Sequence, residues 1–141
     1  MTEIMMSLRP EWFKPIMQKM KAYEVRKSVP LCKAPFKVYL YCTAGGEAVF
    51  RSGVIGKIQS YRMNGTVCGE FTCVGIREVD KPFGGKESGT CLTAKDLNQY
   101  AGSRDRLYYL EISDPVLYEK PRLLEEFGMS RPPQSWCYVR L

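Results

Sequence analysis

Three ionisable residues within six positions are the part of the sequence best suited to chemistry: Lys21, Glu24 and Arg26. The segment 22–27 alternates between apolar and charged residues, which is typical of a half-buried strand. Because side chains two apart in a strand share a face, Glu24 and Arg26 should lie side by side, with Lys21 just before them. Lys21 or Arg26 could hold a phosphate, and Glu24 could accept hydrogen bonds from an exocyclic amine or a ribose hydroxyl. The alternative is a plain surface ion pair between Glu24 and Arg26.

The composition excludes several other kinds of site. The chain of 141 residues has no His, which removes the commonest general base and the commonest zinc ligand. Its six cysteines include no Cys-x-x-Cys pair, and several lie in apolar, strand-like runs, so we interpret them as structural thiols. We therefore expect no metal and no cofactor.

Positive charge is concentrated in the first quarter of the chain. The net charge is +6, and residues 1–40 hold eight basic against three acidic side chains. A local basic patch favours a phosphate-bearing partner, whereas a merely solvated face is the alternative. There is no run of about 18 apolar residues, so we expect no membrane-spanning helix. The first residues do not resemble a secretory signal, and we expect a cytoplasmic protein.

The residues above must be positioned by many short strands and few helices. Residues 10–20 show helical spacing of apolar side chains over about three turns, and Thr93 can cap a helix that runs to about Tyr100. Glycines suggest a bulge in the strand 67–79, and the glycine-rich excursion 43–66 could hold another strand and act as a lid. The other expected strands are 4–8, 22–27, 36–42, 106–113, 116–119 and 135–141. This pattern predicts one α+β domain over residues 1–141, a small mixed β-barrel with two or three short helices.

Several motifs in this chain resemble the ASCH family, a branch of the PUA-like superfamily of small β-barrels. Leu8-Arg9-Pro10-Glu11-Trp12 is similar to the family's opening, and the segment 19–26 resembles its Gly-x-Lys-x-x-Glu-x-Arg motif, with Lys19 in the place of the glycine. Residues 67–71 look like the family's glycine–acid–aromatic strand. The ending 131–138 resembles phage and prophage members.

The resemblance implies a PUA-like barrel that binds RNA or a single nucleotide in a cleft. Our reading of the residues agrees, and places Lys21, Glu24 and Arg26 in that cleft. Aromatic side chains commonly stack on splayed bases, and the candidates are Tyr41, Trp136 and Tyr138. We expect Trp12 to belong to the core, because it lies on the apolar stripe of its helix. Glu70 could be a buried structural partner or part of the site.

The resemblance also leaves an enzyme open. Some small bacterial ASCH proteins are amidohydrolases of N4-acetylcytidine with a Lys–Thr–Glu triad. Lys21 matches the lysine, Glu24 stands in the place of the threonine, and Glu87 lies near the place of the triad glutamate but out of register. Lys21 and Glu24 would be the catalytic pair in such a hydrolase, or in a ribonuclease. A protein-binding phage accessory protein is the third possibility, and the oligomeric state is open.

Overall fold

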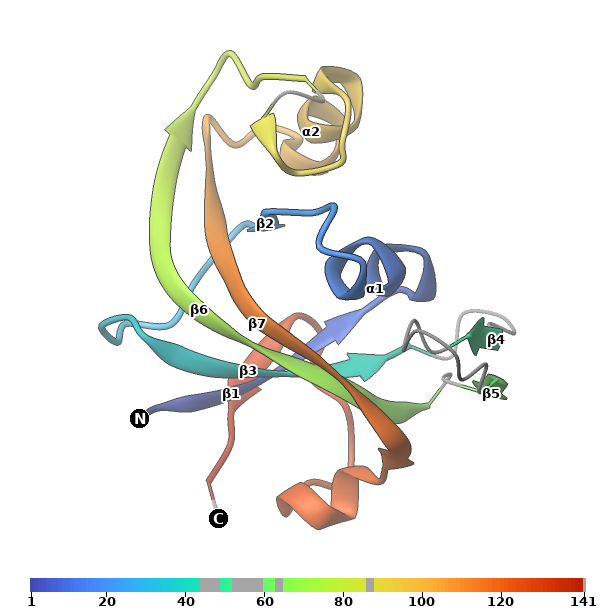
Figure 1. Cartoon of the computed structure of the whole chain (residues 1–141). Coiled ribbons are helices and arrows are strands. Elements are labelled where there is room, and N and C mark those ends of the chain that lie inside the picture. Colours follow the sequence, from blue (N-terminus) through green and yellow to red (C-terminus); the bar gives the residue numbers. More distant parts are fainter. Residues whose placement is uncertain (44–48, 52–59, 63–64, 86–87, 141) are drawn as a thin grey trace.

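The computed structural model describes residues 1–43, 49–51, 60–62, 65–85 and 88–140. Its main element is a six-stranded sheet in the order β2-β7-β6-β3-β1-β8, which Figure 1 shows as a strongly curled surface. β1 and β3 pair in parallel, whereas the other neighbours are antiparallel. The strands are β1 Glu3–Leu8, β2 Tyr23–Arg26, β3 Phe36–Cys42, β6 Thr66–Asp80, β7 Arg106–Arg122 and β8 Trp136–Tyr138, and a separate ladder joins β4 Val49–Arg51 to β5 Ser60–Arg62.

The two longest strands, β6 and β7, carry most of the curvature (Figure 1). Their pairing register shifts three times, at stretches that include Gly69 and Gly75, so the predicted bulging of this strand is confirmed. The sequence predicted two strands where the structure has the single strand β7. Asp114 takes a φ of 50° there, a left-handed conformation that Asp tolerates, so the chain passes through an irregularity and continues to pair with β6.

Helix α1 spans Pro10–Met17 and is shorter than the three turns predicted. It ends because Lys19 adopts a φ of 59°. The Lys19 amide donates to the Ile16 carbonyl over 3.1 Å, and the Met20 amide donates to the Pro15 carbonyl over 2.9 Å. These two bonds form a Schellman motif, whose left-handed position is usually a glycine. The chain is thereby turned out of the helix and towards β2.

Helix α2 spans Ala94–Ala101 and begins at the predicted cap. The Thr93 hydroxyl accepts from the Asp96 amide, and the Asp96 carboxylate accepts from the Thr93 amide, each over 3.1 Å. Leu97 and Ala101 bury this helix against Val25 and neighbouring residues of β7. A short 3₁₀ helix, η2 Leu124–Phe127, follows β7. None of the helices in the described ranges is long and apolar enough to span a membrane.

The core lies on both faces of the sheet. Helix α1 covers the concave face, where Phe13 and Ile16 are fully buried. The segment after β7 covers part of the other face, where Phe127 packs on Tyr39 with ring centroids 4.7 Å apart. β2 and β8 are the two edges of the six-stranded sheet, and no ladder joins them in the described part of the chain. The predicted α+β class, a small barrel-like sheet with short helices, is confirmed, but the barrel is open along one seam.

Candidate functional site

A pocket of about 650 Å³ opens at this seam, between β2, the end of β1 and the two helices. Its lining includes Arg9, Trp12, Lys21, Glu24, Arg26 and Tyr100. The three charges predicted from the sequence therefore line one hollow. They are also buried, since the Lys21, Glu24 and Arg26 side chains are 2%, 6% and 10% exposed. Glu24 and Arg26 do form an ion pair, but because both side chains are buried it is not the surface ion pair that the sequence left as the alternative.

Arg26 holds Glu24 and bridges the seam. Its Nε and Nη2 atoms donate to Glu24 Oε2 over 3.0 and 2.9 Å, as expected for two residues on one face of β2. Nη2 also donates to the Ser7 carbonyl over 2.8 Å, and Nη1 donates to the carbonyl and hydroxyl oxygens of Ser135 over 3.3 and 3.2 Å. A guanidinium has five N–H donors, and these five contacts use them all. Arg26 thus ties β2 to β1 and to the residue before β8.

Lys21 approaches the other carboxylate oxygen of Glu24. Its Nζ lies 3.4 Å from Glu24 Oε1, donates to the Thr90 carbonyl over 2.8 Å and lies 5.0 Å from the centre of the Trp12 ring. The ammonium is therefore held between a carboxylate, a carbonyl and an aromatic face. Together the three side chains carry a net charge of +1.

A loop ahead of α2 fixes Lys21 in this place. The Gly89 carbonyl accepts from the amides of Ala22 and Tyr23 over 2.8 and 3.0 Å. Gly89 has a φ of +80°, and a Cβ there would lie 3.2 Å from both residues, so the close approach depends on glycine. Thr90 is fully buried beside it and offers its carbonyl to Lys21.

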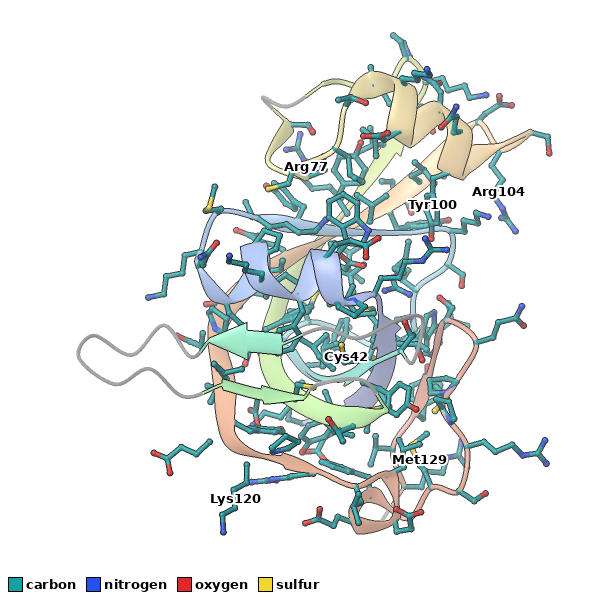
Figure 2. The ribbon with its side chains drawn as sticks, turned by 90° about the vertical axis from the view of Figure 1, so that its right-hand side faces the viewer. Cys42, Arg77, Tyr100, Arg104, Lys120 and Met129 are labelled. Atoms are coloured by element: carbon teal, nitrogen blue, oxygen red, sulfur yellow. The ribbon has the colours of Figure 1, made fainter. Side chains whose placement is uncertain are left out.

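Helix α2 supplies the opposite wall. Tyr100 is 37% exposed and lines the pocket, and Figure 2 shows it near the end of α2. The pKa of its hydroxyl is raised above the usual value, because the effect of burial outweighs the opposing effect of the nearby positive charge of Arg26. Lys27, just after β2, places its Nζ 4.8 Å from the centre of the Tyr100 ring. An aromatic side chain and a cation therefore meet at the mouth of the pocket.

The three aromatic residues predicted to stack on a base lie elsewhere. Tyr41 is 8% exposed and packs in the core with Val67 and Tyr118, because residues after β7 cover a face of the sheet that local alternation had left open. Trp136 donates from its indole to the Ser28 carbonyl over 3.1 Å, and its ring meets Tyr138 edge-on at 5.4 Å. None of these three is among the described residues that line the pocket. The structure therefore does not bring them together with Lys21, Glu24 and Arg26, and their stacking role stays a prediction.

Glu70 is a structural partner on β6. Its carboxylate is 2.8 Å from Lys37 Nζ and accepts from the Tyr118 hydroxyl over 2.9 Å. Glu87 and most of the excursion 43–66 lie outside the described residues, so their predicted roles stay predictions. The six cysteines are free thiols, and no metal-binding group of His, Cys, Asp or Glu occurs in the part of the chain that the structure describes.

Sequence reasoning missed the aromatic walls of the pocket. Trp12 packs against the core, as predicted, but it is only partly buried and also faces the pocket. Its place after Pro10 and Glu11, at the start of a helix that precedes the charged motif, was the available signal. Tyr100 carried no such signal, because only the packing of α2 against β2 and β7 brings it to Lys27 and the pocket.

Comparisons with known proteins identify the fold. No family model matches the chain, and no match was found among curated proteins. Among solved structures, the ASCH protein from Zymomonas mobilis superimposes with a TM-score of 0.71 at 20% identity, covering 98% of this chain and 87% of that one. Two mutants of that protein give TM-scores of 0.71 and 0.73 at 19% identity, covering 98% of this chain and 90% and 88% of theirs. The similarity to phage members stays a prediction. Because these structures superimpose over nearly the whole chain, the chain has the ASCH fold that its N-terminal motifs predicted.

Proposed function

We propose that this chain is a cytoplasmic module that binds RNA or a single, unmodified or modified nucleotide, and that it holds the base in the pocket lined by Lys21, Glu24 and Arg26. The observation that carries this proposal is the burial of three charges at the wall of an open pocket. Buried ion pairs contribute little net stability, so charges that line a cleft favour a binding role. The basic first quarter of the chain favours a phosphate-bearing ligand.

The pocket has the composition expected for a planar heterocycle. Trp12 and Tyr100 give it aromatic walls, and Leu92 adds an apolar one. Glu24 Oε2 is occupied by Arg26, but among the residues that the structure describes Oε1 has only the 3.4 Å contact with Lys21, and it keeps room to accept from a base N–H. Lys21 beside it can donate to a ring nitrogen or a carbonyl. Such adjacent donors and acceptors fit a base edge.

Arg26 serves this site as a positioning residue. Because all five of its donors have protein partners, it orients Glu24 and does not contact a phosphate. This replaces the hypothesis from the sequence that Arg26 could bind a phosphate directly.

Two lysine variants test the proposal. Lys21→Met and Lys37→Met each break one Lys–Glu pair, but only Lys21 lines the pocket. We would screen nucleosides, nucleotides and short RNAs by thermal shift, since a ligand of the native state raises its stability, and then measure affinities by calorimetry. We expect Lys21→Met to weaken binding at least tenfold and Lys37→Met to leave it unchanged. Equal affinities of the two variants, or no binding by the unmodified chain, would overturn the proposal.

The contact between Lys21 and Glu24 also supports a hydrolase as a second candidate. For an N4-acylated cytidine, Glu24 would take a proton from water as the oxygen attacks the acyl carbon, and Lys21 would stabilise the oxyanion. Collapse would break the C–N bond, and the leaving amine would take the proton from Glu24, giving cytidine and a carboxylic acid. In a ribonuclease the same pair would act as base and acid. Incubation with N4-acetylcytidine and with RNA tests both, and substrate that stays intact at high protein concentration excludes them.

A further inference from the structure

The cations inside the pocket are already paired. Arg26 has no donor left, and Lys21 uses two of its three on Glu24 and Thr90, with Trp12 beside it. A phosphate carries its charge on strongly hydrated oxygens, and burying it requires several charge-assisted hydrogen bonds, whereas Arg26 has no donor left and Lys21 has one. The interior therefore suits an uncharged base, and the phosphates must be held outside it.

Two accessible cations lie at the mouth. Arg9, at the junction of β1 and α1, lines the pocket, and its side chain is 76% exposed. Its ion pair with Glu11 is 4.0 Å long and exposed, so it is weak and easily exchanged for another anion. Lys27 is exposed on the side of β2 that faces α2, where it lies over the Tyr100 ring. Arg9 lines the pocket, and Lys27 contacts Tyr100, which also lines it, so the two cations approach the opening from different elements.

We propose that the pocket takes a base from within an RNA strand, and that Arg9 and Lys27 bind the phosphates on the two sides of that nucleotide. This inference rests on the proposed function, because it assumes that the base occupies the pocket. It adds that the ligand is an oligonucleotide and not a free nucleoside.

The test compares single nucleosides with short strands. We would measure the affinities of the four ribonucleosides and of the four RNA homotrinucleotides, at several salt concentrations. The variants are Arg9→Gln, Lys27→Gln and, as a control of equal charge change, Lys120→Gln. Lys120 is exposed at the end of the molecule far from Tyr100 (Figure 2).

We expect the best trinucleotide to bind at least tenfold more tightly than its nucleoside. Arg9→Gln and Lys27→Gln should each weaken the trinucleotide about fivefold, and each should reduce the slope of log affinity against log salt by roughly 0.7. Nucleoside affinity should not change in either variant. Lys120→Gln should bind the trinucleotide with the same affinity and the same salt dependence as the unmodified chain.

Three results would overturn this inference. If the nucleoside binds in a Lys21-dependent way but the trinucleotide binds no more tightly, the strand proposal is wrong and the proposed function stands. If the trinucleotide binds more tightly but Lys120→Gln weakens it as much as Arg9→Gln and Lys27→Gln do, the contacts at the mouth are wrong. A chain that binds neither ligand contradicts both proposals.

Discussion

Arg26 Nη2 donates to the carbonyl oxygen of Ser7 over 2.8 Å and so joins β2, an edge strand, to the strand next to the opposite edge of the sheet. The open seam of the barrel is bridged here by a side chain in place of a backbone ladder. The same guanidinium holds Glu24 at the pocket wall. Arg26 therefore contributes both to the closure of the seam and to the geometry of the pocket.

Arg26→Lys should destabilise the protein by about 3 kcal/mol, because a single ammonium cannot satisfy the Glu24 and Ser7 oxygens and those of Ser135 in a buried site. Urea denaturation measures this loss. Arg106→Lys is the control, since Arg106 also pairs with two carboxylates, but at the surface. Equal urea midpoints for the two variants would contradict the role of Arg26.

Lys19→Gly should stabilise the protein by about 0.5–1 kcal/mol. Lys19 holds a φ of 59° at the end of α1, a conformation that is strained for a side chain with a Cβ and free for glycine. Thermal or urea denaturation measures the gain. Lys14→Gly, inside the same helix, should instead cost about 1 kcal/mol, and the sign difference between the two is the critical result.

Gly69→Ala should destabilise the protein far more than Gly75→Ala, although both glycines lie in β6. A Cβ at position 69 would run into the Val116 carbonyl and approach Phe13 and Met17 of α1 at 3.0 Å, whereas at position 75 it would meet only the flexible end of Glu111. Because Gly69 lets α1 rest on the sheet, its replacement should also weaken ligand binding through Trp12. Similar melting temperatures for both variants would contradict this packing.

Tyr118→Phe should have a pH-dependent effect on stability. Burial alone would raise the pKa of Glu70, but the hydrogen bonds from Lys37 and Tyr118 outweigh it, and the pKa lies below its ordinary value of 4.5. The stability that Glu70 contributes is therefore complete above pH 4.5 and is lost as the pH falls through the lower pKa of the folded state. Without the Tyr118 hydroxyl this pKa rises, so the cost of the substitution should be largest near pH 7 and shrink at acid pH.

Denaturation of Tyr118→Phe between pH 3 and pH 7 measures this trend. Tyr138→Phe is the control, because the Tyr138 hydroxyl accepts from the neutral Leu31 amide and its loss should cost the same throughout. A constant cost for Tyr118→Phe would contradict the link to Glu70.

Local patterns in the sequence located most of the strands of the six-stranded sheet and the charged part of the site, although they divided β7 into two strands and made β8 too long. Alternation placed Glu24 and Arg26 on one face of β2, and the strand 36–42 has the predicted bounds. The Thr93 cap fixed the start of α2. These features depend on contacts between residues that are close in the sequence, so the spacing of residue types is enough to predict them.

The aromatic residues depended on distant contacts and could not be predicted in this way. Alternation showed that Tyr41 faces away from the concave core, but not that η2 and the residues after it cover the other face. It showed Trp12 on an apolar stripe, but not that the open seam leaves one side of its ring facing the pocket. Only the packing of α2 against β2 and β7 places Tyr100 at the opening.

The two tryptophans allow one direct test of where the base binds. Trp12 lines the pocket, whereas Trp136 is not among the described lining residues and donates from its indole to Ser28. The two indole N–H groups should give two signals in a ¹H–¹⁵N NMR spectrum, and the spectrum of Trp12→Phe assigns them. On titration with the tightest-binding RNA, the Trp12 signal should shift saturably and the Trp136 signal should stay in place. A saturable shift of Trp136 alone, or tight binding that moves neither signal, would contradict a base held beside Lys21 and Glu24.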